Sequence, residues 1–367
     1  MDLLFEFTDP LGPEKVIGIY QPGLDLRAIV VIDNVALGPA IGGCRMAPDV
    51  TLEECARLAR AMTLKNAAAG LPHGGAKSVI VADPRMPPER KELTIRAFAH
   101  ALRDVRDYIV GPDMGTDERD MAYIHDEIRR SVGLPREIGG IPLDQIGATG
   151  FGISIAAEVA QDFCDVKLSG ARVAVQGFGA VGKHAARFLA ARGAVLVAAS
   201  DSTAMILNRN GLDVQALAAF KDSGGSIRDF QGGERLSRDA IIGVDCDIWI
   251  PAARPDVITL KNVDLIRAKL ILQGANIPAS DEAEQRLHQR GVLSLPDFIV
   301  NAGGVICAAI EYQGGTQALA FQTIEEKIHE NTLAVLEAAR SHNALPRQAA
   351  VDLARKRVLS AMAYRRF

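Results

Sequence analysis

The spacing of hydrophobic residues changes along the chain, and each change predicts a different element. Short apolar runs separated by turns fill residues 15–45, a pattern typical of a small β-sheet, with a hairpin expected at Asp33-Asn34. From Thr51, apolar residues recur every three or four positions and predict a helix to about Ala69, with Glu54 completing a capping box. The apolar stripe of this helix comprises Cys55, Leu58, Met62, Lys65 and Ala69, so Lys65 is expected on its buried side.

Two more strand and helix pairs follow in the first half of the chain. A strand SVIVAD precedes the amphipathic segment ERKELTIRAFAHALRDV, and a strand DYIV runs into a loop at residues 111–115. Thr116 is expected to cap the helix after this loop. In the second half, the runs ARVAVQ, AVLVAAS, DCDIWIPAA and AKLILQGAN have the continuous apolar character of buried parallel strands. Two helices are expected to end the chain, one from Thr316 to about His342 and one opened by Pro346.

Composition and charge exclude several classes of function. A length of 367 residues favours two domains. The net charge is −4 with both signs interspersed, which argues against a nucleic-acid or membrane partner, and no apolar run approaches the roughly 20 residues of a membrane span. The N-terminus lacks the basic stretch and cleavage site of a signal peptide. The five cysteines form no CxxC pair, so we expect reduced thiols in the cytoplasm and no metal site.

Two lysines flank a glycine-rich turn and are the first candidates for chemistry. Lys65 closes the predicted helix, and Lys77 follows Gly74-Gly75-Ala76 at the start of a strand. An amine in a tight and partly dry place has its pKa lowered, which suits Lys77 to polarise a carbonyl or activate water. For Lys65, an anion site and a stem that merely reaches towards solvent remain equally open.

Asp113 and the pair Gly42-Gly43 are further candidates. Asp113 lies in a loop at the end of a strand, where catalytic groups are often presented, although a turn aspartate that binds backbone N–H groups is the simpler interpretation. Gly42 and Gly43 would let the backbone pass close to a ligand, and a β-bulge is the alternative.

A dinucleotide-binding fingerprint stands in the second half. A strand precedes the glycines, a helix follows them, and Asp201 stands at the end of the next strand, nineteen residues after the last glycine. Asp201 is expected to accept hydrogen bonds from the ribose, which favours NAD, whereas Ser202 would tolerate the 2′-phosphate of NADP. The residues of the turn are Gly177, Phe178, Gly179, Ala180, Val181 and Gly182.

The fingerprint and the strand pattern together predict an α/β protein of two domains. Residues 146–334 are expected to form a doubly wound Rossmann domain that binds the dinucleotide. Residues 1–145 are expected to form a second α/β domain, to which residues 335–367 return. Small or amide residues that follow the apolar runs, namely Ala252, Asn276 and Asn301, are candidates to line the cofactor crevice, with loop capping as the alternative.

At this point the chain resembles the amino-acid dehydrogenases that act on glutamate, leucine, valine and phenylalanine. The motifs that carry the resemblance are GPAIGGCRM, MTLKNAAAGLPHGGAKSVI, GPDMGTDERDM, GFGAVG and PDFIVNAGGVICAA. The resemblance implies reversible oxidative deamination of an L-amino acid to a 2-oxo acid and ammonia, in a homo-oligomer. It makes residues 1–145 the substrate-binding and oligomerisation domain. It implies that Lys65 binds the substrate α-carboxylate, that Lys77 activates water, and that Asp113 shuttles protons. It also implies that Asn301 and the segment after it hold the substrate near the nicotinamide, and it places Thr149 in the cofactor site.

Departures from the family pattern bear on the substrate. Glutamate enzymes carry a lysine where this chain has Ile41, and a serine where it has Ala308. An unpaired buried γ-carboxylate would cost several kcal/mol, so we expect an apolar side chain in a pocket that includes Gly111 and Val305. A glutamate dehydrogenase that uses another cation remains the alternative within the family. A nucleotide-binding regulator without turnover is the alternative of another class.

Overall fold

The computed structural model describes residues 5–365 and divides the chain into two compact units. The first unit comprises residues 1–143, 305–320 and 351–367, and the second comprises 144–304 and 321–350. The boundaries expected above differ mainly in two places, since residues 335–350 group with the second unit and residues 305–320 with the first. Part of the N-terminal segment on which we based the absence of a signal peptide, Met1–Leu4, lies outside the described residues.

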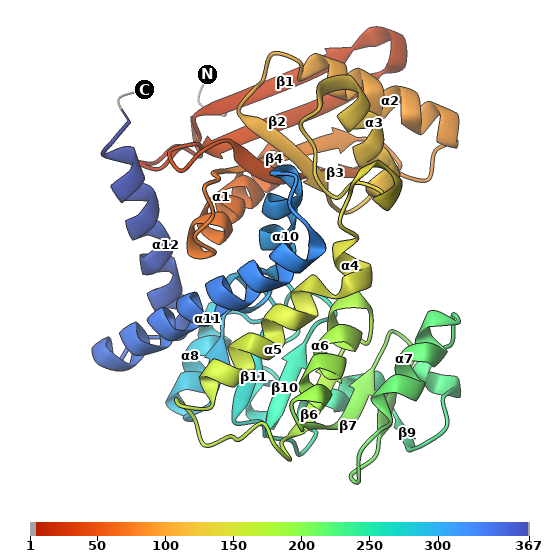
Figure 1. Cartoon of the computed structure of the whole chain (residues 1–367), viewed down its shortest axis with the longest axis vertical. Coiled ribbons are helices and arrows are strands. Elements are labelled where there is room, and N and C mark those ends of the chain that lie inside the picture. The colour runs from red at the N-terminus through yellow and green to blue at the C-terminus, as the bar shows by residue number, and fades with distance from the viewer. Residues whose placement is uncertain (1–4, 366–367) are drawn as a thin grey trace. The chain divides into compact units, whose positions relative to one another are not determined.

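The first unit is built on a sheet with helices on both faces (Figure 1). Within the described residues, the sheet has five strands in the order β1-β2-β4-β3-β5, with β3 parallel to both of its neighbours. The elements are β1 (Lys15–Gln21), β2 (Leu26–Asn34), β3 (Ala40–Ala47), α1 (Leu52–Ala68), β4 (Gly75–Val81), α2 (Pro88–Ala101), β5 (Tyr108–Pro112) and α3 (Glu118–Ile128).

Alternation along the strands creates two cores in this unit. In β2, Val30 and Ile32 point to a core that includes residues of α2 and α3. Val31, between them, points to the opposite core, where it packs with Cys55 and Ala59 of α1. Because successive side chains of a strand face opposite sides, one apolar strand serves both layers of helix.

The expected hairpin at Asp33-Asn34 is wrong. The hairpin joins β1 to β2 through residues 22–25, and the chain leaves β2 after Asn34 to enter β3, two strands away. Both residues are buried, and their side chains are bound: the Asp33 carboxylate accepts from Arg60 and Thr63, and Asn34 donates to the carbonyl of Leu11. These bonds hold the end of a strand rather than a turn.

The helix predicted from Thr51 is confirmed as α1, but its buried face is different. The Thr51 side chain accepts from the N–H of Glu54 and caps the helix, while the Glu54 carboxylate binds Arg45 instead of completing a capping box. Leu58, Met62 and Lys65 are only half-buried. Small and polar side chains pack against the sheet because they allow a closer approach: Cys55, Ala56, Ala59, Thr63, Asn66 and Ala67.

The N-terminal cap of α3 also differs from the prediction. Asp117, not Thr116, is the N-cap of α3, in a reciprocal capping box with Asp120. The Thr116 hydroxyl donates instead to the carbonyl of Cys44, which leaves the cap to the next residue.

The second unit is a doubly wound α/β domain, as predicted. In the described part of the chain its sheet runs β12-β11-β10-β6-β7-β8-β9, parallel from β12 to β7, with β8 and β9 antiparallel at one edge. The strands are β6 (Arg172–Gln176), β7 (Val195–Ser200), β8 (Met205–Leu207), β9 (Glu234–Leu236), β10 (Ile248–Pro251), β11 (Leu270–Leu272) and β12 (Leu293–Leu295). The helices include α5 (Ala148–Ala160), α6 (Ala180–Ala191), α7 (Val214–Asp222), α8 (Asp281–Gln289) and α9 (Asp297–Val300).

Three helices carry the chain between the two units. They are α10 (Gly303–Tyr312), α11 (Gln317–His342) and α12 (Pro346–Met362). Helix α11 lies within one residue of its predicted bounds, and α12 begins at Pro346 as predicted. In α12, Arg357 donates to the carbonyls of Ala67 and Ala68 at the end of α1, so this end of the chain is fastened within the first unit.

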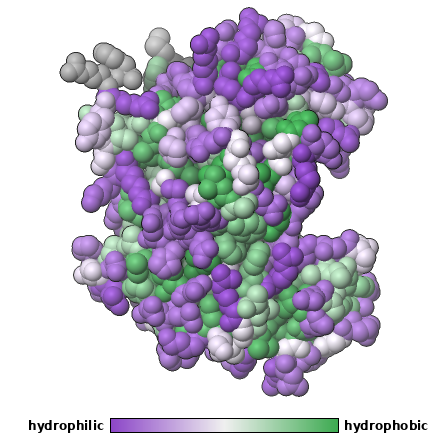
Figure 2. Space-filling model, viewed as in Figure 1, coloured by the Kyte–Doolittle hydropathy of each residue, from purple (hydrophilic) through white to green (hydrophobic). Residues whose placement is uncertain are grey.

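The molecular surface agrees with the balanced composition. On the face shown in Figure 2, hydrophilic side chains predominate and hydrophobic ones are interspersed among them. Among the described residues, no helix is long and apolar enough to cross a membrane.

Candidate active site

Three neighbouring parallel strands bring Lys77 and Asp113 together in the first unit. Lys77 projects from β4, and its amine lies 2.6 Å from Oδ2 of Asp113, which directly follows β5. The side chain of Lys77 is 6% exposed and that of Asp113 is 23% exposed, so the pair is largely removed from water but open on one side. Because β3 lies between β4 and β5, its residue Gly43 is placed next to the pair.

Gly43 creates the space that the pair needs. A Cβ atom at this position would lie 2.8 Å from Cβ of Asp113 and 3.1 Å from the amine of Lys77. Any larger residue would therefore press on the ion pair. Gly42 has another role, because a Cβ there would lie 1.7 Å from the carbonyl oxygen of Ala76, and only glycine allows the two strands to approach so closely.

Arg45 is a second cation on the same carboxylate, and the sequence analysis missed it. Its Nε lies 2.9 Å from Oδ2 of Asp113, the oxygen that also binds Lys77, and its Nη1 pairs with Glu54 of α1. Oδ1 takes part in none of the bonds found in the described part of the chain, so it can accept a hydrogen bond from another molecule. The spacing in the sequence could have identified Arg45, because it lies two positions after Gly43 and therefore on the same face of β3.

The charges around Asp113 determine its ionisation. Burial alone would raise the pKa of the Asp113 carboxyl, but the ion pairs with Lys77 and Arg45 outweigh burial and hold the pKa below its ordinary value. Thr116 fixes the backbone by accepting from the N–H of Asp113 at 3.0 Å. Asp113 is thus a preorganised carboxylate rather than a simple turn residue.

Lys65 lies in the last turn of α1, on the helix that covers the face from which Lys77 projects. Lys77 pairs in register with Val31, whose side chain packs with residues of α1. Lys65 itself is half-buried. A half-buried cation beside this face is compatible with either interpretation offered from the sequence, a carboxylate ligand or a stem that reaches towards solvent.

Apolar and small residues surround the same region. Ile41 is 3% exposed and lies two positions before Gly43, so it shares the face of β3 that carries the ion pair. Gly111 is the register partner of Gly43 on β5, and a Cβ there would meet Val132 at 3.4 Å. At the position where we expect glutamate enzymes to carry a lysine, this chain therefore has the buried apolar side chain of Ile41.

Helix α10 is fastened to the first unit by a buried carboxylate. Glu311 is 8% exposed, and it accepts from the backbone N–H groups of Gly133, Leu134 and Ile141 at 2.7–3.1 Å. Ala308, one turn earlier on the helix, is buried, and Val305 is half-buried. The sequence analysis did not identify Glu311, because the partners of its carboxylate lie about 170 residues away along the chain.

In the second unit, the glycine-rich turn has the geometry of a phosphate-binding loop. Gly177 has φ +89°, a conformation that favours glycine, and a Cβ at Gly182 would lie 2.1 Å from the carbonyl oxygen of Gly177. No atom lies within 4 Å of a Cβ built on Gly179, and this residue caps α6 without a side-chain bond. The space beside Gly179 is therefore open at the N-terminus of α6, where a pyrophosphate would need to approach the backbone. In the rest of the turn, Phe178 is buried in the core, Val181 is half-buried and Ala180 is exposed.

The order of the strands places further candidates at this turn. Strand β7 lies on one side of β6, and β10, which comes later in the chain, lies on the other side. The strand order therefore reverses at β6, and the crevice of the doubly wound sheet opens between β6 and β10. Ala252 follows β10 directly, and the next residue, Ala253, would lie 2.7 Å from a Cβ on Gly177. Ala252 thus borders the phosphate turn.

Asn276 and Asn301 are joined by a hydrogen bond. Nδ2 of Asn301 donates to Oδ1 of Asn276 at 3.0 Å, and Oδ1 of Asn301 is buried without a protein partner. Asn301 ends the short helix α9 rather than a strand. Ile277 has φ +47°, a strained conformation for a β-branched residue, beside Asn276. Thr149 lies in the first turn of α5. A Cβ atom at Gly303 would collide with the backbone of this turn.

Asp201 stands at the end of β7, but its carboxylate is already bound. Oδ2 accepts from the amine of Lys221 at 2.8 Å and from the N–H of Ile227 at 2.9 Å. Oδ1 accepts from the N–H and the hydroxyl of Thr203. Burial would raise the pKa of Asp201, and these bonds lower it far below its ordinary value.

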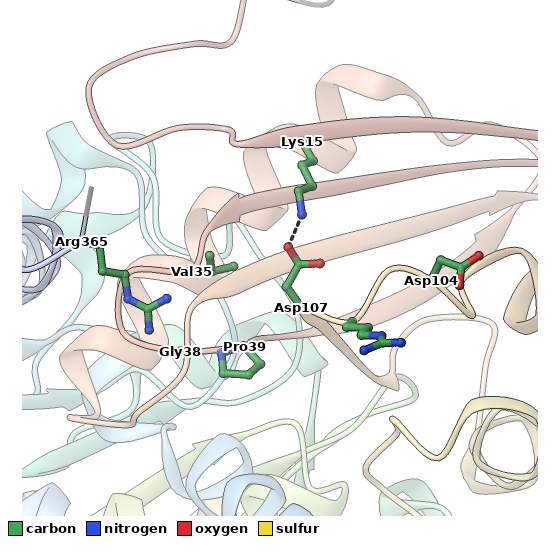
Figure 3. Close-up of a pocket in the computed structure, with 8 residues that line it drawn as sticks. Lys15, Val35, Gly38, Pro39, Asp104, Asp107 and Arg365 are labelled. Atoms are coloured by element: carbon green, nitrogen blue, oxygen red, sulfur yellow. Dashed lines mark hydrogen bonds and ion pairs between the residues drawn. The ribbon is translucent and has the colours of Figure 1, made fainter. Parts of the chain in front are cut away.

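A hollow elsewhere in the first unit contains none of the predicted site residues. Figure 3 shows Lys15 in contact with Asp107 at its wall. Its volume is about 400 Å³, and its lining comprises Lys15, Val35, Gly38, Pro39, Asp104, Arg106, Asp107 and Arg365. We assign it no role in the chemistry. The described residues also contain no cluster of three or more potential metal ligands from His, Cys, Asp or Glu.

Comparison with known proteins supports the interpretation of the two units. A sequence model described as "Glutamate/Leucine/Phenylalanine/Valine dehydrogenase" matches residues 139–366, and one described as "Glu/Leu/Phe/Val dehydrogenase, dimerisation domain" matches residues 23–130. The chain belongs to the glutamate, leucine, phenylalanine and valine dehydrogenase family. Members of this family are amino-acid dehydrogenases that use nicotinamide cofactors.

Individual relatives differ in substrate and cofactor. Glutamate dehydrogenase of Aeropyrum pernix is 39% identical over 356 residues, covering 90% of this chain and 85% of that protein. NADP(+)-dependent glutamate dehydrogenase of Pyrobaculum calidifontis is 37% identical over 355 residues, covering 90% and 84%. The crystal structure of L-tryptophan dehydrogenase from Nostoc punctiforme has a TM-score of 0.77 at 28% identity and covers 98% of this chain and 100% of that one.

Proposed function

We propose that this dehydrogenase catalyses reversible oxidative deamination of an apolar L-amino acid to its 2-oxo acid and ammonia. The observation that carries the proposal is the buried contact of Lys77 with Asp113 at 2.6 Å, beside the space left by Gly43. A cation that polarises oxygen and a carboxylate that accepts protons are both needed for this reaction, and here one contact aligns them.

In this proposal, the amine of Lys77 and the carboxylate of Asp113 divide the proton transfers. Lys65 binds the α-carboxylate of the substrate, and Oδ1 of Asp113 takes a proton from the substrate ammonium group. A nicotinamide cofactor held by the second unit would supply the acceptor for the hydride of Cα, which converts the amine to an iminium group. Water then adds to the resulting iminium carbon next to Lys77, and the proton that this water loses passes to solvent by way of the Lys77 amine. Asp113 returns its proton to the nitrogen, and the C–N bond of the carbinolamine breaks as the hydroxyl group releases a second proton to solvent and becomes the carbonyl of the 2-oxo acid. The products are the 2-oxo acid, ammonia and the reduced cofactor.

The second unit is proposed to hold the cofactor. The N-terminus of α6 and the open space at Gly179 suit the pyrophosphate, and the unpaired Oδ1 of Asn301 suits the carboxamide or ribose of the nicotinamide half. The fingerprint favoured NAD through Asp201. Because that carboxylate is bound within the protein, we do not base the choice between NAD and NADP on it.

The apolar substrate is proposed from the residues at the pocket. Ile41 and Ala308 are buried and carry no charge, and the nearby guanidinium of Arg45 is already paired with Asp113 and Glu54. A substrate γ-carboxylate would need a partner that these residues do not supply. Glutamate is the second candidate, favoured by the 39% identity to a glutamate dehydrogenase.

The deciding experiment measures reduced cofactor at 340 nm with glutamate, leucine, valine, phenylalanine and tryptophan, each with NAD and with NADP. We expect turnover of apolar substrates to exceed that of glutamate by at least tenfold. A dominant rate on glutamate would overturn the pocket argument and leave the chemistry intact. Lys77→Ala and Asp113→Asn should each lower kcat by at least about a hundredfold, and equal rates in either variant would overturn the mechanism.

The same assay tests a nucleotide-binding regulator without catalysis. Cofactor binding without turnover of any amino acid would favour that reading over ours. We further propose a homo-oligomer, supported by the match of residues 23–130 to a domain described by its dimerisation.

A further inference from the structure

The residue after Asn276 is held in a strained conformation without help from packing. Ile277 has φ +47°, in the left-handed region that a β-branched residue rarely adopts. Its side chain is 48% exposed, so burial contributes little to keeping it there. Its backbone is bound instead, because its N–H donates to Oδ2 of Asp297 at 2.9 Å and its carbonyl accepts from the N–H of Asp256 at 3.0 Å. Strain of this kind persists only where the surrounding structure imposes it.

Asp297 belongs to a buried cluster of charged and polar side chains. Its other oxygen, Oδ1, accepts from Nη2 of Arg347 at 3.0 Å. Nε of Arg347 lies 2.8 Å from each oxygen of Glu284, and Nη2 also donates to Oε1 of Gln273 at 2.7 Å. Asp297, Glu284 and Gln273 are all buried. A buried carboxylate that is bound on both oxygens cannot rotate without leaving a donor unpaired, so the cluster fixes the side chain of Asp297.

The same helix presents Asn301. Asp297 is the first residue of α9, and its carbonyl accepts from the N–H of Asn301 at 2.8 Å. Nδ2 of Asn301 donates to the carbonyl of Gly274 at 3.3 Å and to Oδ1 of Asn276 at 3.0 Å. The amide is therefore oriented with its buried Oδ1 free of partners among the described residues. A buried acceptor in this state suits a ligand that donates a hydrogen bond.

We propose that Asp297 and Arg347 are positioning residues of the cofactor site. Together they hold Ile277 in its strained conformation, fix Asn276 beside it, and so orient the Asn301 amide to accept a hydrogen bond from the nicotinamide half of the cofactor. The donor is the carboxamide NH₂ or a ribose hydroxyl. In this role neither Asp297 nor Arg347 needs to touch the cofactor. The inference rests on the proposed function for the presence of a nicotinamide dinucleotide.

The first test is cofactor binding by the full-length protein without any amino acid. It follows the fluorescence of NADH or NADPH, whichever the wild type binds more tightly. Asp297→Asn keeps the size of the side chain but offers one acceptor oxygen to two donors, the guanidinium of Arg347 and the N–H of Ile277. We expect the Kd to rise at least about tenfold, because the Asn301 amide loses its orientation. In turnover assays the KM for the cofactor should rise, while the KM for the amino acid changes less than about twofold.

Ser294→Ala is the matched control within the same cluster. The Ser294 hydroxyl is buried and accepts from Nε2 of Gln273 at 3.0 Å, and no bond found among the described residues joins this hydroxyl to Ile277 or Asn301. The control should lower stability and leave the Kd for the cofactor within about twofold of wild type. A rise in Kd for Ser294→Ala as large as that for Asp297→Asn would overturn the proposal, because the cluster would then act through stability alone.

Hydrogen exchange gives a second readout, in the absence of cofactor. Peptides that cover residues 273–279 should exchange at least about tenfold faster in Asp297→Asn at the amide of Ile277, which loses its acceptor. Arg347→Lys serves where Asp297→Asn does not fold, since it keeps the buried charge but lacks the fork of the guanidinium. It should raise the Kd in the same direction, by about threefold or more. Wild-type exchange and wild-type Kd in the variant that folds would overturn the proposal.

An analogue of the cofactor identifies the donor group. In the acetylpyridine analogue a methyl group replaces the carboxamide NH₂, and its Kd is measured by displacement of the reduced cofactor. The effect of Asp297→Asn should vanish with this analogue if Asn301 accepts from the carboxamide, and persist if it accepts from the ribose. A wild type that binds no nicotinamide dinucleotide would overturn the inference. Failure of the amino-acid reaction alone would instead appear as intact cofactor binding without turnover, still weakened by Asp297→Asn.

Discussion

Asp113 is the residue whose neighbours most restrict the chemistry of the first unit. Lys77 and Arg45 share its Oδ2, so the carboxylate is held in one orientation with Oδ1 directed away from both cations. Two cations on one oxygen also keep the group ionised, since they lower the pKa against the effect of burial. At the scale of single residues, the site therefore depends on charge placement and on the missing side chain of Gly43.

Removal of Arg45 should change the pH dependence of the reaction. A depressed carboxyl pKa stabilises the fold above the ordinary pKa and loses this contribution as the pH falls through the folded-state pKa. Arg45→Met removes one of the two cations, so the pKa of Asp113 should rise, and the acidic limb of kcat/KM should move upwards by roughly one pH unit. Arg85→Met, which breaks a pair of exposed groups, is the control. An unchanged acidic limb in Arg45→Met would contradict this electrostatic role.

A methyl group at Gly43 should disturb the pair directly. Gly43→Ala places Cβ 2.8 Å from Cβ of Asp113 and 3.1 Å from the amine of Lys77, so these two side chains must shift. We expect kcat to fall by about tenfold to a hundredfold, because small displacements of catalytic groups are costly. Gly18→Ala, on β1 with no atom within 4 Å of the new methyl, should leave kcat unchanged. Equal activity in the two variants would show that the space beside Gly43 is not needed.

At the scale of elements, buried side-chain bonds fasten helices to distant segments of the same unit. Glu311 joins α10 to three backbone N–H groups of residues 133–141. In the second unit, Arg347 of α12 binds Glu284 of α8 and Asp297 of α9, and Asp297 also accepts from the N–H of Ile277. These bonds place the elements that carry Ala308, Asn276 and Asn301.

Weakening the anchor of α10 should lower stability. In Glu311→Gln, the amide nitrogen replaces one acceptor oxygen and faces N–H donors, so at least one buried donor loses its partner. We expect the free energy of unfolding to fall by about 1–3 kcal/mol, measured by urea denaturation. Glu330→Gln, at an exposed position of α11, is the control. An unchanged urea midpoint for Glu311→Gln would mean that the three bonds contribute nothing net.

At the scale of the whole molecule, each unit has a sheet and a core of its own. The first unit carries the ion pair of Lys77 with Asp113, and the second carries the glycine-rich turn. A ligand that binds to one unit therefore need not stabilise the other to the same extent. For a chain built this way, a single two-state transition is not expected.

Cofactor should therefore protect the second unit selectively. A ligand at 100 times its Kd stabilises the form that binds it by about 2.7 kcal/mol. With NADH added, hydrogen exchange should slow in peptides from β6, α6 and β10 more than in peptides from β1 and β2, which serve as the internal control. Equal protection of both sets would show that the units unfold as one.

The sequence alone determined the elements and the chemistry that depend on local order. Period, caps and glycine spacing predicted α1, α11, α12 and the strand–turn–helix of the fingerprint, because each rests on residues that are neighbours in the chain. The family motifs likewise identified Lys77 and Asp113 as candidates.

Tertiary structure decided what depends on distant partners. Asp33-Asn34 ends a strand because Arg60 and Leu11 bind it, and Arg45 joins the site because β3 lies between β4 and β5. Asp201 is occupied because Lys221 and Ile227, which follow it by 20 and 26 residues along the chain, donate to its carboxylate. Such bonds connect side chains whose separation in sequence carries no regular period, so only the folded chain reveals them.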